Sequence, residues 1–173
     1  FYVDNQNIEA DYPKFYRTTQ TKLAREQRKQ SKMVKGSKNR AKQRVKVARL
    51  HERIKNQRLD FLHKLSTKLA NLYDYICVED LNMKNISQCL KLAKSTLDNS
   101  FGLFRTLLSY KLEERGKKLL MIDKWFPSSK MCRFCGTVNT DLKLSDRIWT
   151  CSCGKELNRD ENAAINILSE ALS

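Results

Sequence analysis

The longest regular hydrophobic pattern lies in the first half of the chain. Between Val47 and Leu72, apolar residues recur three, four or seven positions apart, the period of one face of an α-helix. The members of this stripe are Val47, Leu50, Ile54, Phe61, Leu65, Leu69 and Leu72. A basic segment without Gly or Pro precedes it at 17–34, and residues 35–39, which contain Gly36, separate the two. The pattern predicts two antiparallel helices with one apolar seam and basic outer faces.

The second half of the chain alternates short apolar runs with longer helical patterns. Residues 75–78 and 119–122 are apolar runs followed by acids, which predicts two buried strands with carboxylates at their ends. Residues 97–116 predict a helix with Gly116 as its C-cap, and residues 158–172 predict a closing helix. The expected apolar face of the first is Leu97, Phe101, Phe104, Leu107, Leu108 and Leu112. That of the closing helix is Ala163, Ala164, Ile167, Leu168, Ala171 and Leu172.

The chain begins with a loosely alternating pattern around a turn signal at residues 4–7. It predicts a hairpin with flanking strands at residues 1–3 and 12–16. Taken in order, the elements are a hairpin, a helical hairpin, a strand, a helix, a strand, a cysteine-rich segment and a helix. This order predicts an α/β fold with two inserted modules.

The positive charge of the chain is concentrated in one segment. The 173 residues carry a net charge of +15, yet residues 14–68 alone hold 19 basic and three acidic residues, a net of +16. Such a segment repels itself unless a polyanion lies nearby, so a nucleic-acid partner is favoured over a merely solvated helical surface. Candidate contacts lie around the break between the two helices: Lys35, Lys38, Arg40, Lys42 and Arg44.

Four of the six cysteines fall within 22 residues, in two close pairs that are each followed by glycine. The ligands in this pattern are Cys132, Cys135, Cys151 and Cys153. Two such turns can surround one tetrahedral Zn²⁺ through four thiolates, which makes the site structural rather than catalytic. Cysteines that are spaced as metal ligands, in a sequence without a secretory signal, favour a reducing compartment such as a cytosol. No apolar run is long enough to span a membrane.

Two acids stand where a catalytic metal site could form. Glu79 ends the first apolar strand, and Asp160 lies in the first turn of the closing helix. Two carboxylates facing each other could hold divalent cations for phosphodiester hydrolysis. The alternative is that Glu79 is an ordinary surface residue and Asp160 only complements the helix dipole.

Several segments together resemble the C-terminal half of TnpB, the OrfB-type accessory transposase of bacterial insertion sequences and a relative of the type V CRISPR effectors. The matching segments are Val78–Asn82, Trp125–Lys130 ahead of the first cysteine pair, and Asn158–Ile167. The resemblance extends to Lys14–Arg17 and to the segment around Gly36–Arg40, so it covers essentially the whole chain.

The resemblance implies an RNase H-like (RuvC) core with an inserted basic helical hairpin and an inserted zinc ribbon. The implied boundaries are a core at 1–127 with its helical insertion at about 17–72, a ribbon at 128–156 and a closing helix at 157–173. It implies an RNA-guided DNA endonuclease that uses Mg²⁺, with a guide RNA and a target DNA as partners and no membrane. By motif, Glu79 and Asp160 are its second and third catalytic acids, and the four cysteines bind zinc.

The resemblance also implies a first catalytic Asp in a strand ahead of Phe1. We expect the chain alone to be inactive without it, which makes a non-catalytic RNA- or DNA-binding module the alternative function. A strand-transfer transposase is a third and weaker alternative. Asp4 is expected to be a turn residue rather than that missing acid.

A few residues carry smaller expectations. Arg159 is equally a candidate phosphate contact and an exposed helix residue. Trp125 and Phe126 are expected in the core, Cys77 as a small core residue, and His51 and His63 as non-ligands. Cys89 has no assigned role.

Overall fold

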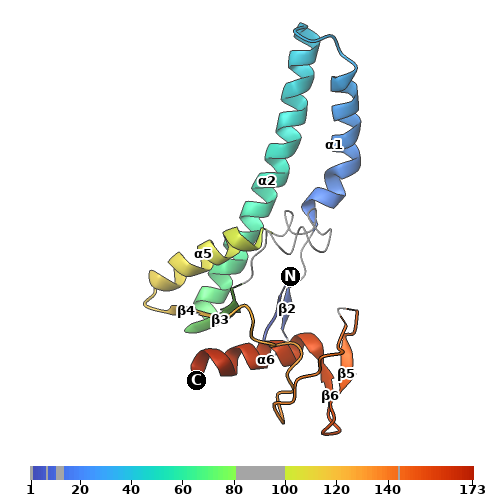
Figure 1. Cartoon of the computed structure of the whole chain (residues 1–173). Coiled ribbons are helices and arrows are strands. Elements are labelled where there is room, and N and C mark those ends of the chain that lie inside the picture. Colours follow the sequence, from blue (N-terminus) through green and yellow to red (C-terminus); the bar gives the residue numbers. More distant parts are fainter. Residues whose placement is uncertain (1, 7, 11–13, 81–99, 144) are drawn as a thin grey trace. The chain divides into compact units, whose positions relative to one another are not determined.

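The computed structural model describes residues 2–6, 8–10, 14–80, 100–143 and 145–173, and the chain divides into two compact units. Unit 1 contains residues 1–12, 73–85 and 112–173, and unit 2 contains residues 13–72 and 86–111. Figure 1 shows the described elements of both. Among the described residues, no helix combines the length and the apolar composition that a membrane crossing requires.

Unit 2 is built around a long helical hairpin. Helix α1 (Phe15–Ser31) runs antiparallel to α2 (Lys38–Leu72), as the sequence predicts. Its seam is a core of Leu23, Val47 and Ile54, and the partly buried Phe15, Tyr16 and Leu50 pack against it. Leu72 was expected in this stripe, but it is exposed at the end of α2.

The connection between the two helices is closed by local hydrogen bonds. Gly36 adopts a φ of 84°, a left-handed conformation that glycine tolerates without strain. The Ser37 hydroxyl accepts from the backbone N–H of Arg40, and the Arg40 guanidinium donates to the carbonyl oxygen of Met33. The predicted break at 35–39 is therefore a specific turn that begins a few residues earlier.

Helix α5 (Phe101–Glu113) follows the predicted pattern, with Leu107, Leu108 and Leu112 buried. The backbone N–H of Gly116 donates to Glu113, in agreement with the predicted C-cap. Leu97 and the rest of the predicted helix start lie outside the described residues.

The buried amine of Lys111 joins α5 to α2 within unit 2. It donates to the His63 carbonyl oxygen and to the hydroxyls of Ser66 and Thr67, at 2.7–2.8 Å. His51 and His63 themselves are exposed.

The first element of unit 1 is a small hairpin of β1 (Tyr2–Val3) and β2 (Glu9–Ala10). The Asp4 carboxylate accepts from the backbone N–H groups of Gln6 and Ile8, which is the Asx geometry expected of a turn residue. The predicted second strand at 12–16 is wrong at Phe15 and Tyr16, which belong to α1, and residues 12 and 13 lie outside the described residues. The Asp4 side chain closes the turn between β1 and β2.

The two strands predicted in the second half form a parallel pair. Strand β3 (Tyr75–Glu79) pairs with β4 (Lys118–Ile122), with Glu79 opposite Ile122. Both strands were expected to be buried, but most of their residues are half-exposed, because the described sheet has only two strands.

The last part of unit 1 is an antiparallel pair followed by a helix. Strand β5 (Ile148–Thr150) pairs with β6 (Glu156–Asn158), and α6 (Arg159–Leu172) follows at once. Helix α6 packs against β1, β3, β4 and β6 and thereby brings the three strand pairs of unit 1 together.

Candidate metal centre and acid site

Two tight turns present the four clustered cysteines. In the first, the backbone N–H of Cys132 donates to Thr137 and that of Gly136 donates back to Cys132. In the second, Cys151 donates to Lys155 and Gly154 donates to Cys151. Gly136 and Gly154 have φ values of 74° and 83°, so each turn needs its glycine.

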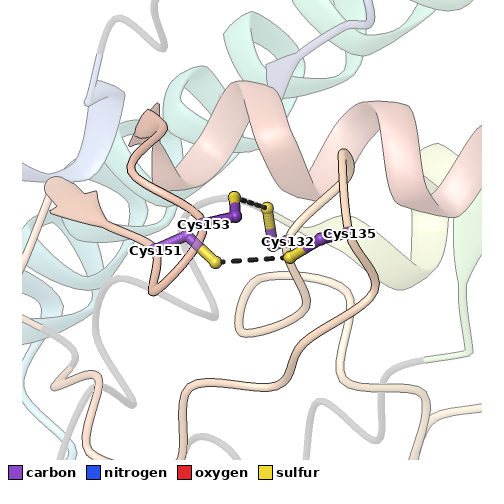
Figure 2. Close-up of side chains that lie close together, drawn as sticks. All are labelled: Cys132, Cys135, Cys151 and Cys153. Atoms are coloured by element: carbon purple, nitrogen blue, oxygen red, sulfur yellow. Dashed lines mark hydrogen bonds between the residues drawn. The ribbon is translucent and has the colours of Figure 1, made fainter.

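The two turns bring the four sulfur atoms into one cluster, as Figure 2 shows. All four Sγ atoms lie within 4.8 Å of one another, with 3.8 Å between Cys132 and Cys153 and 3.5 Å between Cys135 and Cys151. Four sulfurs at about 2.3 Å from a central Zn²⁺ would lie about 3.8 Å apart in a tetrahedron. The spacing therefore fits a four-thiolate metal site.

Hydrogen bonds favour thiolate formation at two positions of the cluster, because they lower the pKa of Cys135 and of Cys151. The hydroxyl and backbone of Thr137 hydrogen-bond to Cys135, and together they lower the pKa of its thiol to about 6. A thiolate is the form that binds a metal ion.

A small hydrophobic core holds the two turns together. It consists of Cys132, Trp149, Cys151 and Leu157, with Leu142 packed against it. Four residues and one neighbour bury little apolar area, so a metal ion would be the main cross-link of this segment.

Glu79 lies at the carboxyl end of β3. Its Oε1 accepts a hydrogen bond from the hydroxyl of Ser128, a residue of the segment that leads into the first cysteine turn. The acid is half-buried, and a neutral hydroxyl is its partner.

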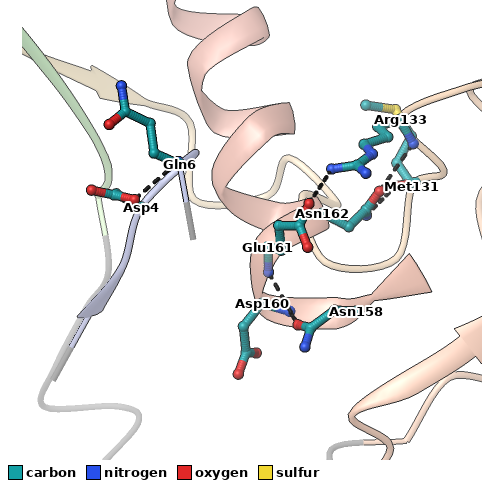
Figure 3. A network of polar contacts seen from close by, with 8 residues as sticks. All are labelled: Asp4, Gln6, Met131, Arg133, Asn158, Asp160, Glu161 and Asn162. Atoms are coloured by element: carbon teal, nitrogen blue, oxygen red, sulfur yellow. Dashed lines mark hydrogen bonds and ion pairs between the residues drawn. The ribbon is translucent and has the colours of Figure 1, made fainter. Parts of the chain in front are cut away.

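Asp160 lies in the first turn of α6, where Asn158 caps the helix by accepting from the N–H groups of residues 160 and 161. Figure 3 shows the carboxylate at the starting end of the helix, beside Asn158. It pairs with the guanidinium of Arg147 at 2.5 Å and with that of Arg159 at 3.1 Å. Asp160 therefore has two cationic partners.

The structure brings the four cysteines together, as the sequence predicts. Among the described residues, the cysteines form the only group of three or more candidate metal ligands. Glu79 and Asp160 are placed on β3 and α6, two elements that contact each other.

Two buried amides were missed by the sequence reasoning. Asn162 and Asn166 are only 1% and 4% exposed, although the apolar face of α6 was expected at other positions. Those six expected residues are partly buried or, for Leu172, exposed. The signal that could have found the pair is the i, i+4 spacing of two asparagines, the first of which lies two residues after Asp160.

The candidate nucleic-acid contacts are placed on the α1–α2 turn and the start of α2. Lys35, Lys38, Lys42 and Arg44 are exposed. Arg40 is half-buried and serves the turn, and Arg159 is half-buried against Asp160.

Three smaller expectations had different outcomes. Trp125 is 80% exposed, so its expected place in the core is wrong; it lies on the surface with the amine of Lys124 over its ring. Cys77 is half-buried, and burial raises the pKa of its thiol. Cys89 lies outside the described residues.

Comparison with known families gives two matches. Residues 1–90 match a family described as a probable transposase, OrfB_IS605. Residues 101–167 match a family described as Cas12f1-like, TNB domain, and this stretch contains all four clustered cysteines.

Individual relatives agree with the family matches. The chain is 47% identical over 161 residues to a Streptomyces pristinaespiralis protein named "Putative RNA-guided DNA endonuclease", covering 93% of this chain and 40% of the relative. It is also 35% identical over 170 residues to InsQ of Escherichia coli K12, which has the same description. That match covers 89% of this chain and 42% of the relative. It is also 35% identical to the TnpB-like protein L79 of Acanthamoeba polyphaga mimivirus, over 73% of this chain and 25% of the relative. The chain thus spans about two fifths or less of these relatives.

Proposed function

The chain belongs to the OrfB, or TnpB, family of IS605-type transposases, and from this premise we propose that it is part of an RNA-guided DNA endonuclease. The printed names of the relatives support this activity. In the proposal the core of the chain is RNase H-like (RuvC), with the α1–α2 hairpin and the cysteine turns as insertions. The four cysteines hold a structural Zn²⁺, which their sulfur spacing fits.

In this proposal Glu79 and Asp160 are metal-binding acids of the nuclease site. The observation that carries it is their placement: one ends β3, and the other begins α6, the helix that packs on β3 and β4. Bound Mg²⁺ ions would align a water and stabilise the leaving oxygen in phosphodiester hydrolysis. The protein groups orient the acids, since Ser128 donates to Glu79 and Arg159 donates to Asp160.

Metal binding to these acids can be measured with Mn²⁺, a paramagnetic substitute for Mg²⁺, by electron paramagnetic resonance. We expect Glu79→Ala and Asp160→Ala each to weaken Mn²⁺ binding at least about tenfold, because each removes a charged ligand. Glu113→Ala and Asp141→Ala remove exposed acids elsewhere and serve as matched controls. Equal Mn²⁺ affinity in all four variants would overturn the proposed acid site.

We expect the 173-residue chain to cleave DNA poorly. Two carboxylates hold metal ions loosely, and a displacement of about 1 Å can cost about 100-fold in rate. Strong Mg²⁺-dependent cleavage of DNA by this chain, lost in Glu79→Ala, would contradict this expectation and at the same time establish the role of Glu79.

Nucleic-acid binding without catalysis is the second candidate function, and the charge of the α1–α2 hairpin favours it. The exposed residues Lys35, Lys38, Lys42 and Arg44 lie at one end of the hairpin. If Lys42 contacts a phosphate, Lys42→Ala lowers RNA affinity and reduces the slope of log K against log salt by about one. Lys143→Ala, in the cysteine-rich segment, is the matched control, and equal slopes for both variants would exclude Lys42 as a contact.

A further inference from the structure

The buried amides of α6 bind one short backbone segment. The amide nitrogen of Asn166 donates to the carbonyl oxygens of Ser128 at 2.8 Å and of Met131 at 2.7 Å. Asn162 donates to the same two oxygens, at 3.5 and 2.7 Å. Burying an amide is costly unless it is hydrogen-bonded, so the two side chains and the two carbonyls satisfy each other. Together they fix the path of residues 128–131 on the first turns of α6.

The side chains of Asn162 and Asn166 thus form a clamp on the backbone. Ser128 connects this clamp to the acid on β3. The serine is 4% exposed, its carbonyl oxygen accepts from both asparagines, and its hydroxyl donates to Oε1 of Glu79. The Asn162–Asn166 pair therefore contacts the backbone of Ser128, and Glu79 contacts its side-chain hydroxyl. A shift of the Ser128 backbone would move the donor away from the carboxylate.

The same clamp reaches the first cysteine turn. The Asn162 side-chain oxygen accepts from the backbone N–H of Arg133 at 3.1 Å, as Figure 3 shows. The Arg133 guanidinium also pairs with Glu161 at 2.8 Å. Cys132, the first sulfur of the metal cluster, is thus flanked on both sides by residues that α6 holds.

We propose that Ser128 is the positioning residue of Glu79, and that Asn162 and Asn166 hold Ser128 in place, so that α6 and the first cysteine turn set the orientation of the Glu79 carboxylate. This inference deepens the proposed function, because it concerns an acid assigned there to metal binding. The geometry itself stands on hydrogen bonds between described residues of unit 1.

The direct test follows the Glu79 carboxyl ¹³C resonance in the full chain labelled with ¹³C-glutamate, assigned with Glu79→Gln. Ser128→Ala removes the donor and should shift this resonance. Asn166→Ala does not touch Glu79 but should shift it in the same direction. The double variant should shift it no further than Ser128→Ala alone, because both changes act through one hydroxyl. Ser129→Ala, the neighbouring serine, is the matched control and should leave the resonance in place.

Two results would overturn the inference: an unchanged Glu79 resonance in a folded Asn166→Ala variant, or shifts that add in the double variant. Zinc content and far-UV circular dichroism report whether a variant is folded. If Asn166→Ala does not fold, Asn166→Leu, which keeps the size of the side chain but removes its donor, is the second variant, and its Glu79 resonance decides by the same criterion.

Mn²⁺ binding separates this inference from the proposed function. Ser128→Ala should weaken Mn²⁺ binding about tenfold, and less than Glu79→Ala does, because the ligand remains but is misplaced. If Glu79→Ala itself has no effect on Mn²⁺ binding, the metal role of Glu79 fails while the resonance test still decides the positioning. If Glu79→Ala weakens binding and Ser128→Ala does not, the positioning inference fails and the acid site stands.

Discussion

At the scale of single residues, Asp160 is distinguished by its two cationic partners. Arg159 is the adjacent helix residue and is half-buried, whereas the Arg147 side chain is 68% exposed and lies ahead of β5. A metal ion that binds Asp160 must compete with both guanidinium groups. Arg147 is the easier one to displace, because water can solvate its charge once it leaves.

Removal of Arg147 should therefore tighten metal binding. We expect Arg147→Ala to increase Mn²⁺ affinity up to about fivefold, since an exposed ion pair contributes up to about 1 kcal/mol. The measurement is a Mn²⁺ titration followed by electron paramagnetic resonance. Arg115→Ala breaks an ion pair with Glu114 instead and should leave the affinity unchanged. Weaker Mn²⁺ binding in Arg147→Ala would show that this arginine supports the site.

The residues that the sequence predicts best are those whose role depends on spacing alone. The cysteine cluster was predictable because two close cysteine pairs, each followed by a glycine, form two tight turns that can surround one metal ion. Ser128 was not predictable, because its role depends on Glu79, 49 residues away, and on the side chains of Asn162 and Asn166, 34 and 38 residues away. Trp125 was misassigned because hydrophobicity alone does not tell a core residue from an exposed one.

At the scale of elements, the α1–α2 hairpin is held by buried hydrogen bonds as well as by its apolar seam. The buried Gln43 side chain of α2 donates to the carbonyl oxygen of Glu26 at 3.0 Å and to its carboxylate at 2.8 Å. This hydrogen bond, followed by those from Lys29 and Arg25, lowers the pKa of Glu26 below its ordinary value of 4.5. The ionised form of Glu26 is thus favoured when the hairpin is folded.

The hairpin should consequently lose stability in acid. A carboxylate whose pKa is lowered by folding stabilises the folded state above its ordinary pKa, and that contribution disappears as the pH falls through the folded value. Between about pH 5 and pH 3, the melting temperature should fall more steeply for the natural chain than for Glu26→Gln. Thermal melts followed by circular dichroism give both curves. Parallel curves would mean that Glu26 titrates alike in both states.

The elements themselves were predicted with uneven success, for a physical reason. Helices α1 and α2 were predictable because a period of three to four residues over many turns is an unambiguous signal. The hairpin β1–β2 was misplaced because each strand has only two residues, too few to show an alternation. Strand β6 was not expected, because Glu156–Asn158 has one apolar residue and depends on its pairing with β5.

At the scale of the whole molecule, unit 1 depends on the cysteine cluster and on one helix. The cysteine turns have a small core of their own, and α6 is the element that contacts β1, β3, β4 and β6. Because α6 also binds the residues on both sides of Cys132, disorder in the cysteine turns should spread to Ser128.

Removal of zinc should therefore unfold the cysteine turns and disturb Glu79. Zinc binding to a four-thiolate site contributes on the order of 10 kcal/mol, more than the local apolar core can replace. We expect purified protein to contain about one zinc per chain, and a chelator to shift the Glu79 carboxyl ¹³C resonance as Ser128→Ala does. Cys132→Ser should reproduce the effect without a chelator, whereas Cys77→Ser, outside the cluster, should not. Less than half a zinc per chain would contradict the assignment.

The wide separation of the pieces of unit 1 in the sequence has a consequence for biosynthesis. Helix α2 ends at Leu72, and α6 ends at Leu172, one hundred residues later. At about 5–20 residues per second, a ribosome needs about 5–20 s to make that stretch. The hairpin can form from local contacts during this interval, whereas β1 and β3 must wait for the helix that packs on them. The nascent chain therefore exposes its basic hairpin to cellular RNA before Asp160 has been synthesised.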